Sequence, residues 1–276
     1  MNSKVYMLTG ATSGIGKAVA QELAGTGETV ILVARDEERG ARVQKEISTA
    51  AENPNIDLQL CDLGNLSSVR NLATIINDRY DRLDALINNA SVYKRERSTT
   101  VDGYETMFAT NHLGPFLLTY LLLDRLLAAG LARIINITAP STSHLNFEDL
   151  QSENEFNSLH AFGATKMANL LFTFELAGRL EHTGVTVNAV HPGLVRTSLM
   201  KEAILPIRLL TWLFSSSPNR AARKIVALAT APEFEDTNGK FLHRGKEIQP
   251  DAYALNPDIQ SRLWQVSEQL TGIAPK

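Results

Sequence analysis

Cysteine is nearly absent from this sequence. The 276 residues include one cysteine, Cys61, so no intrachain disulfide can form. Chains with so little cysteine usually work in a reducing compartment, and we therefore expect a cytoplasmic location. Cysteine and histidine also form no cluster with the spacing of a metal site, so we expect no bound metal.

A strong excess of charge of one sign is missing as well. The formal net charge is −3, and lysine and arginine form no block along the chain. Nucleic-acid binding needs a concentrated basic surface, so this composition gives it no support. We expect a small-molecule ligand instead.

Long hydrophobic runs are lacking too. The most apolar late segment, Ala203–Phe214, is interrupted by Pro206 and Arg208 and falls well short of the ~20 residues that span a bilayer. Residues Met1–Lys4 lead straight into a strand-like segment and leave no room for a signal peptide. We expect no transmembrane segment, and weak contact of Ala203–Phe214 with a membrane surface remains open.

What the chain does have is an alternation of short β-branched runs with longer amphipathic stretches. This pattern predicts a Rossmann-type, doubly wound α/β fold with a mostly parallel seven-stranded sheet and helices on both faces. The expected strands are Val5–Thr9, Thr29–Ala34, Ile56–Cys61, Ala85–Asn88, Arg133–Thr138, Val185–Val190 and Lys240–His243. The expected helices are Gly16–Ala24, Asp36–Ala50, Leu66–Tyr80, Tyr104–Leu127 and His160–Glu181.

No linker or repeat interrupts this alternation, so residues 1–276 are expected to form one dinucleotide-binding domain. The alternation stops over about 200–218, just after the sixth expected strand. Insertions at the carboxyl ends of strands build the ligand crevice of such sheets. We interpret this one as a flap over the substrate, while a surface helix pair packed on the body is the alternative.

A glycine-rich turn joins the first expected strand to the first helix. Gly10 permits the tight turn, Gly14 lets a pyrophosphate approach the backbone, and Gly16 allows close packing of helix and strand. The helix N-terminus then offers free N–H groups and positive potential to the phosphates. The residues expected to hold the dinucleotide here are Thr9, Gly10, Thr12, Ser13, Gly14, Ile15 and Gly16.

The end of the second expected strand indicates which dinucleotide binds. A carboxylate there would accept a hydrogen bond from the ribose of NAD and repel a 2′-phosphate. This chain has Arg35, whose guanidinium can pair with a phosphate. Asp36 follows and would favour NAD(H) if it pointed at the ribose. We predict NADP(H) as the cofactor, in preference to NAD(H).

Thr9–Gly16 resembles the TGxxxGxG turn of the short-chain dehydrogenase/reductase family, and the resemblance extends over nearly the whole chain. Asp62-Leu63 resembles the family's adenine-contacting pair, and Asn88–Ser91 resembles its NNAG segment with serine in place of the last glycine. The resemblance implies that Asn89, Ala90 and Lys166 also bind the cofactor, together with residues of the PG…T segment: Pro192, Gly193, Val195 and Thr197.

Three stretches are similar to the retinol dehydrogenase and WW-domain oxidoreductase branch of this family. They are Lys166–Thr173, His191–Thr197 and the tail from Gly239 to Gly272. The similarity to this branch implies oxidation or reduction of a lipophilic alcohol or carbonyl.

The resemblance also identifies the catalytic positions. The family uses an asparagine, a serine, a tyrosine and a lysine four residues after the tyrosine, on the same helix face. Asn111 and Lys166 match the asparagine and the lysine. Phe162 stands at the tyrosine position, and Ala139 stands at the serine position. Both hydroxyls that handle the proton are therefore missing.

Nearby residues offer poor replacements for these hydroxyls. Thr138 should face the other way on its strand, and His160 should lie on another side of the helix. Ser141 and Ser143 lie on the following loop and would have to swing in. Three explanations stay open: an enzyme disabled by shape-preserving substitutions, a natural NADP(H)-binding sensor or interaction protein, and an enzyme of non-redox chemistry such as a cyclase or isomerase.

Apolar residues are expected around the crevice. They are Leu145, Phe147, Phe156, Leu159 and the insertion residues Ile204–Phe214. An apolar pocket with few polar groups predicts a lipophilic substrate, although the same residues would also suit an ordinary core. Apolar side chains on more than one face of Tyr104–Leu127 are compatible with a homodimer or homotetramer, but burial against the sheet explains them equally well.

Overall fold

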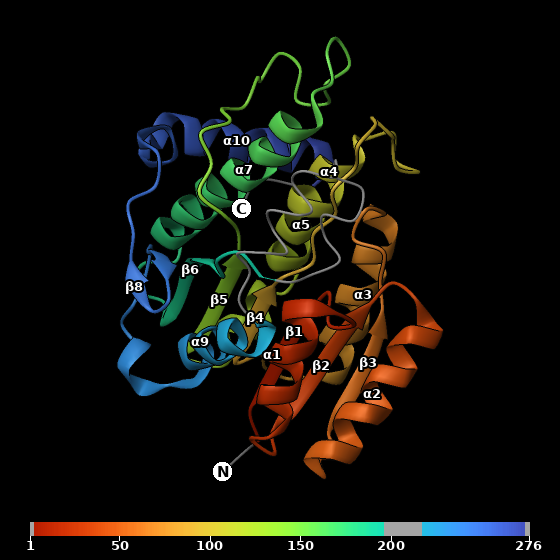
Figure 1. Cartoon of the computed structure of the whole chain (residues 1–276). Coiled ribbons are helices and arrows are strands. Elements are labelled where there is room, and N and C mark those ends of the chain that lie inside the picture. The colour runs from red at the N-terminus through yellow and green to blue at the C-terminus, as the bar shows by residue number, and fades with distance from the viewer. Residues whose placement is uncertain (1–2, 196–216, 274–276) are drawn as a thin grey trace.

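The computed structural model describes residues 3–195 and 217–273, and the molecule is built around one twisted sheet (Figure 1). The strand order is β3-β2-β1-β4-β5-β6-β7-β8, with all neighbours parallel except β7 and β8. The Rossmann-type prediction is confirmed. The strands are β1 (Val5–Thr9), β2 (Thr29–Ala34), β3 (Ile56–Leu60), β4 (Ala85–Asn88), β5 (Ala132–Ile137), β6 (Val185–His191), β7 (Phe241–His243) and β8 (Lys246–Glu247).

The predicted count of seven strands was one short. The eighth strand, β8, pairs antiparallel with β7 across a two-residue turn, Arg244-Gly245. Both turn residues have positive φ, 53° and 79°, which suits a tight hairpin. Because β8 is two residues long, exposed and charged, it carries no apolar pattern that would predict a strand.

Helices cover both faces of the sheet (Figure 1). On one face α1 (Gly14–Ala24), α2 (Glu37–Ala51) and α9 (Pro218–Thr230) bury their apolar sides against residues such as Leu8 and Leu32. The other face is covered by α3 (Leu66–Arg79), α5 (Gly114–Leu121), α6 (Leu123–Leu127), α7 (Ser158–Arg179) and α10 (Pro257–Thr271). Short 3₁₀ turns occupy Pro232–Phe234 and Ala252–Leu255.

The helix predicted over Tyr104–Leu127 is broken into segments. It consists of α4 (Thr106–Phe108), a π-helical turn at Ala109–Leu113, then α5 and α6. The Glu105 carboxylate accepts hydrogen bonds from the amides of Met107 and Phe108 and so fixes where the helix begins. All residues from Gly114 to Tyr120 are buried within the chain, so packing inside one molecule accounts for the apolar pattern of this segment.

The predicted insertion over 200–218 lies outside the described residues except for its last two positions, and Pro218 begins α9. Its interpretation as a flap therefore stays a prediction. Within the described part of the chain, no helix is both long and apolar enough to cross a membrane.

Candidate functional site

The glycine-rich turn lies at the carboxyl edge of β1, beside the end of β2. The amide of Gly10 donates to the Val33 carbonyl at 3.1 Å, and Gly10 and Gly14 have φ values of +68° and +53°. A Cβ on Gly16 would overlap the Gly10 carbonyl and lie 2.6 Å from Asn89 Nδ2. The turn is therefore packed so closely that position 16 has no room for a side chain.

The N-terminus of α1 is open to an anion. Helix α1 begins at Gly14, and the side chain of its N-cap residue, Ser13, makes no capping hydrogen bond. The first amides of a helix have no acceptor within the helix and carry the positive end of its dipole. Thr12, Ser13 and Ile15 are partly exposed along this turn. These features fit the phosphates of a dinucleotide.

Thr9 connects the turn to the end of β4. Its side chain is fully buried, and its hydroxyl accepts hydrogen bonds from the amides of Asn89 at 3.0 Å and Ala90 at 3.1 Å. The Asn89 side chain donates in return to the Thr9 carbonyl at 2.9 Å. Thr9 thus links the glycine-rich turn after β1 to the segment that follows the neighbouring strand β4.

Arg35 and Asp36 follow β2 directly and differ in what they contact. Arg35 is exposed. The Asp36 carboxylate is the N-cap of α2 and accepts from the Arg39 amide at 2.8 Å. Asp36 is therefore engaged with its own helix, while the guanidinium of Arg35 is accessible at the strand end.

Asp62 and Leu63 follow β3 at the same edge of the sheet. Leu63 is buried, and Asp62 Oδ1 accepts from the Gly64 amide at 3.0 Å. The Asp62 amide donates to the hydroxyl of Ser68 at 3.1 Å. These bonds hold the Asp62 segment at the carboxyl edge of the sheet.

Lys166 lies in the middle of α7 and faces the segment after β4. Its Nζ donates to Ser91 Oγ at 2.8 Å and stands 5.0 Å from the centre of the Phe162 ring. The residue is only 6% exposed. Burial lowers the pKa of Lys166 to about 8.

Asn111 sits in the π-helical turn and connects three parts of the site. Its Oδ1 accepts from the Val92 amide at 2.7 Å, and its Nδ2 donates to the Val92 carbonyl at 2.9 Å and to Thr165 Oγ1 at 3.2 Å. The wider π turn brings this buried side chain between α7 and the segment after β4.

The structure brings the two hydroxyl-free positions to the same region. Phe162 lies one turn before Lys166 on α7, and Ala139 follows β5 by two residues. The Phe162 ring packs edge-on against Tyr93, with ring centres 5.6 Å apart. The phenol of Tyr93 is hydrogen-bonded to Ser158 Oγ at 2.9 Å, so it is already engaged.

Most of the replacement hydroxyls considered above are occupied. Thr138 Oγ1 donates to the Lys166 carbonyl, and Ser141 Oγ donates to the Gly163 carbonyl, each at 2.8 Å. Ser143 packs against α7 at Gly163, where a Cβ would overlap its side chain. His160 is exposed.

The segment after β6 completes the edge of the site. Pro192, Gly193 and Val195 are partly exposed there, while Thr197 lies outside the described residues. His191 precedes them, and burial lowers its pKa to about 4. Its ring lies 4.8 Å from that of His243, centre to centre, so this histidine is neutral near pH 7.

The apolar residues predicted to surround the substrate are divided between core and surface. Leu145 is buried, with Phe147 packed against the same core cluster. Phe156 and Phe162 both pack against a small cluster that includes Tyr93, and Leu159 is 48% exposed. Close by in the sequence, Leu194 is 50% exposed.

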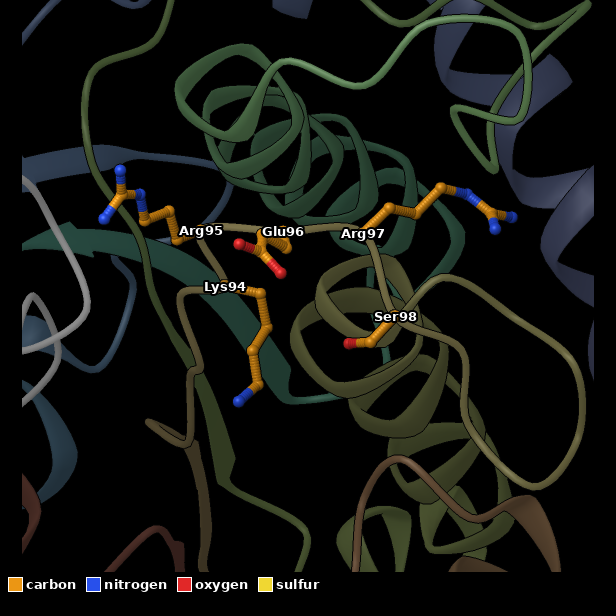
Figure 2. Close-up of a pocket in the computed structure, with 5 residues that line it drawn as sticks. All are labelled: Lys94, Arg95, Glu96, Arg97 and Ser98. Carbon is orange, nitrogen blue, oxygen red and sulfur yellow. The ribbon is translucent and has the colours of Figure 1, made fainter.

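A cavity of about 450 Å³ lies beside residues Lys94–Ser98, on the segment between β4 and α4 (Figure 2). Arg95 and Arg97 point to opposite sides of this segment, and Lys94 points away from both. Arg97 Nε donates to the Gln151 carbonyl at 3.0 Å. The lining is mostly charged, so this cavity is not the apolar pocket that the sequence predicts.

Two contacts of the site were missing from the sequence analysis: Ser91 on the Lys166 amine, and Tyr93 on the Phe162 ring. Both residues follow the Asn88–Ala90 segment, and serine in place of glycine at position 91 was the available signal. Among the described residues, no group of three or more metal-ligating side chains is assembled.

Comparison with known proteins gives relatives that are similar to this chain in sequence and in fold. The family model described as short chain dehydrogenase matches residues 4–205. Human retinol dehydrogenase 14 is 37% identical over 294 aligned positions, which cover 99% of this chain and 88% of that protein.

Two solved structures extend the comparison. An uncharacterized protein from Mycobacterium paratuberculosis superposes with a TM-score of 0.79 at 31% identity, covering 99% of this chain and 95% of that one. A metagenomic short-chain oxidoreductase in complex with NADP superposes with a TM-score of 0.67 at 25% identity, covering 90% and 97% of the two chains.

Proposed function

Because this chain belongs to the short-chain dehydrogenase family, we propose that it binds NADP(H) and a lipophilic carbonyl or alcohol in a site whose hydride transfer is strongly impaired. The observation that carries the proposal is the pairing of Lys166 with Phe162. The Lys166 amine lies 5.0 Å from the centre of the Phe162 ring. That ring stands at the position where the family has its phenol, but it bears no hydroxyl.

The residues at the carboxyl edge fit a dinucleotide. The amides at the start of α1 would bind its phosphates, and Asn89, Ala90, Lys166, Pro192 and Gly193 would surround its ribose and nicotinamide. When bound, the reduced nicotinamide supplies a hydride. The preference for NADP(H) rests on the exposed guanidinium of Arg35 and on the commitment of Asp36 to α2. The NADP complex of the related oxidoreductase supports a nicotinamide dinucleotide as the cofactor.

The proposed substrate class rests on two observations. Exposed apolar side chains, Leu159 and Leu194, lie on segments that follow β5 and β6 at the cofactor edge. The name of human retinol dehydrogenase 14 indicates a lipophilic polyene alcohol as the substrate of that relative. We propose all-trans-retinal as the first carbonyl to test.

The impairment follows from the proton that must accompany the hydride. Ala139 cannot bind the substrate oxygen, and Phe162 cannot exchange a proton with it. Loss of a general acid alone lowers a rate by roughly 10²–10⁴-fold. Asn111 and Lys166, which hold the cofactor side of the site, are both in place.

The direct test restores both hydroxyls. Phe162→Tyr combined with Ala139→Ser is expected to raise NADPH-dependent reduction of all-trans-retinal by about 10²–10⁴-fold. The matched control is Phe174→Tyr, which adds a phenol to α7 three turns away and should leave the rate unchanged. No gain in the double variant with retinal or any other lipophilic aldehyde or ketone, at saturating NADPH, would contradict the proposal.

A further inference from the structure

The Lys166 amine is held by a side chain from another part of the fold. Its Nζ donates to the hydroxyl of Ser91, which comes from the segment after β4, a different part of the fold from α7. The backbone of Lys166 is fixed as well, because its carbonyl accepts from Thr138 Oγ1 on β5. The amine is thus held at a defined position beside the ring of Phe162.

Ser91 stands where the NNAG segment that this chain resembles has glycine. A glycine cannot contact the amine, whereas Ser91 Oγ lies 2.8 Å from it. The chain therefore lacks two hydroxyls that serve the substrate in the family and has a different hydroxyl, on the lysine. Two of these departures, Ser91 and Phe162, lie beside the Lys166 amine.

Within the described residues, no carboxylate raises the pKa of Lys166. The groups that face it from the segment after β4 are Ser91 and Tyr93, whose phenol is bonded to Ser158. Asn111 Nδ2 donates to Thr165, the residue before Lys166, and Thr138 Oγ1 donates to the Lys166 backbone carbonyl. Burial is the cause that lowers the pKa of Lys166 to about 8, so the ammonium predominates at pH 7 and still releases its proton readily. Enzymes that use lysine as an acid or base lower its pKa to this range.

We propose that Lys166, positioned by Ser91, donates the proton to the substrate oxygen in this chain, in the role that the family assigns to the phenol missing at position 162. This inference rests on the proposed function, because the hydride comes from a reduced nicotinamide. As the carbonyl carbon gains the hydride, its C=O π electrons move to oxygen. That oxygen then takes a proton from the Lys166 ammonium, leaving a neutral amine that solvent reprotonates.

Other donors near Phe162 are less suited to this step. The hydroxyls of Thr138 and Ser141 already donate to backbone carbonyls, and their protons do not ionise near neutral pH. His191 is neutral there, because burial lowers its pKa to about 4. Lys166 combines a proton that ionises near neutrality with a fixed position beside the Phe162 ring.

The kinetic test uses Lys166→Arg and Ser91→Ala in the full chain, with all-trans-retinal and saturating NADPH. Arginine keeps the positive charge but does not release its proton. We expect Lys166→Arg to lower kcat by about 100-fold or more, and saturating NADPH keeps any loss of cofactor affinity out of kcat. In the parent, kcat should fall as the pH rises from 7 to 9, because the ammonium loses its proton.

A second measurement is independent of activity. Competitive acetylation of the apo chain between pH 6 and 10, read by mass spectrometry, gives the titration of each amine. Lys166 is expected to titrate near pH 8, and Lys45, exposed on α2, serves as the surface reference. Ser91→Ala should shift the Lys166 titration to lower pH, because the ammonium loses its hydrogen-bond acceptor. The fall in kcat should move to lower pH with it.

Three results would overturn the inference: full kcat in Lys166→Arg, a flat pH profile in the parent, or a Lys166 titration that Ser91→Ala leaves unchanged. The restored variant, Phe162→Tyr with Ala139→Ser, separates the two proposals. If it reduces retinal while the parent shows no reduction at any pH, the proton-donor role of Lys166 fails and the proposed function stands. If the restored variant is inactive, the proposed function fails, and the amine titration still tests the positioning by Ser91.

Discussion

In the proposed function, the choice of dinucleotide depends on Arg35. Its guanidinium is exposed after β2, and the neighbouring carboxylate caps α2. Hydrogen bonds to a charged group contribute about 1.5–3 kcal/mol, so Arg35→Ala should weaken NADPH binding by about 10–100-fold and leave NADH binding unchanged. Fluorescence titration with both dinucleotides measures this. Arg42→Ala, on the exposed side of α2, is the control, and equal losses for both dinucleotides in Arg35→Ala would contradict the assignment.

For single residues, the sequence predicted which positions belong to the site but not which side chains they contact. The resemblance to the family located Phe162, four residues before Lys166, and Ala139 at the serine position. The bond between Ser91 and Lys166 joins residues 75 positions apart, and the packing of Tyr93 on Phe162 joins residues 69 apart. The serine at position 91 marked an unusual residue, but neither contact could be predicted, because both arise from how α7 docks on the segment after β4.

The tight packing of α1 against the glycine-rich turn predicts an effect at the scale of an element. A Cβ on Gly16 would overlap the Gly10 carbonyl, whereas at Gly25, just past the end of α1, the nearest heavy atom is 3.5 Å away. Overpacking usually costs about 1–3 kcal/mol. Gly16→Ala should therefore lower the free energy of unfolding in urea by that amount and weaken NADPH binding, while Gly25→Ala should do neither. Native-like NADPH affinity in Gly16→Ala would contradict the proposal that the glycine-rich turn binds the dinucleotide.

Secondary-structure elements were predictable where their apolar pattern is regular. All seven predicted strands are present with ends shifted by at most one residue, because buried strands in a parallel sheet read as continuous apolar runs. The break at Ala109–Leu113 was not predictable, since a π turn keeps an apolar helical pattern. Helices α9 and α10 were also missed. Both begin at a proline, Pro218 and Pro257, which is a favourable first helical residue.

At the scale of the whole molecule, stability should depend on pH through buried histidines. His112 lies fully buried in the π-helical turn, where its Nε2 is 2.8 Å from Ser267 Oγ on α10, and burial lowers its pKa from 6.5 to about 3. The unfolded chain binds a proton at this residue below about pH 6.5, and the folded chain does not. The contribution of neutral His112 to the free energy of unfolding is therefore fully present above pH 6.5. It falls by about 1.4 kcal/mol per pH unit as the pH drops below this value.

Urea unfolding at pH 7, 6 and 5 measures this loss. His112→Gln should have a shallower pH dependence than the parent, because its buried side chain does not titrate, whereas His160→Gln on the exposed surface of α7 should match the parent. The difference between parent and variant isolates His112 from the carboxylates and from His191. An unchanged slope in His112→Gln would show that this histidine is protonated in the folded state.

For the whole molecule we propose binding of a phosphorylated dinucleotide at the carboxyl edge of the sheet. The first amides of α1 and the guanidinium of Arg35 hold it there. Titration of the purified chain with NADPH, followed by calorimetry, tests it most directly. We predict saturable binding with one site per chain, tighter than the binding of NADH. The absence of a saturable signal at millimolar NADPH would contradict the account.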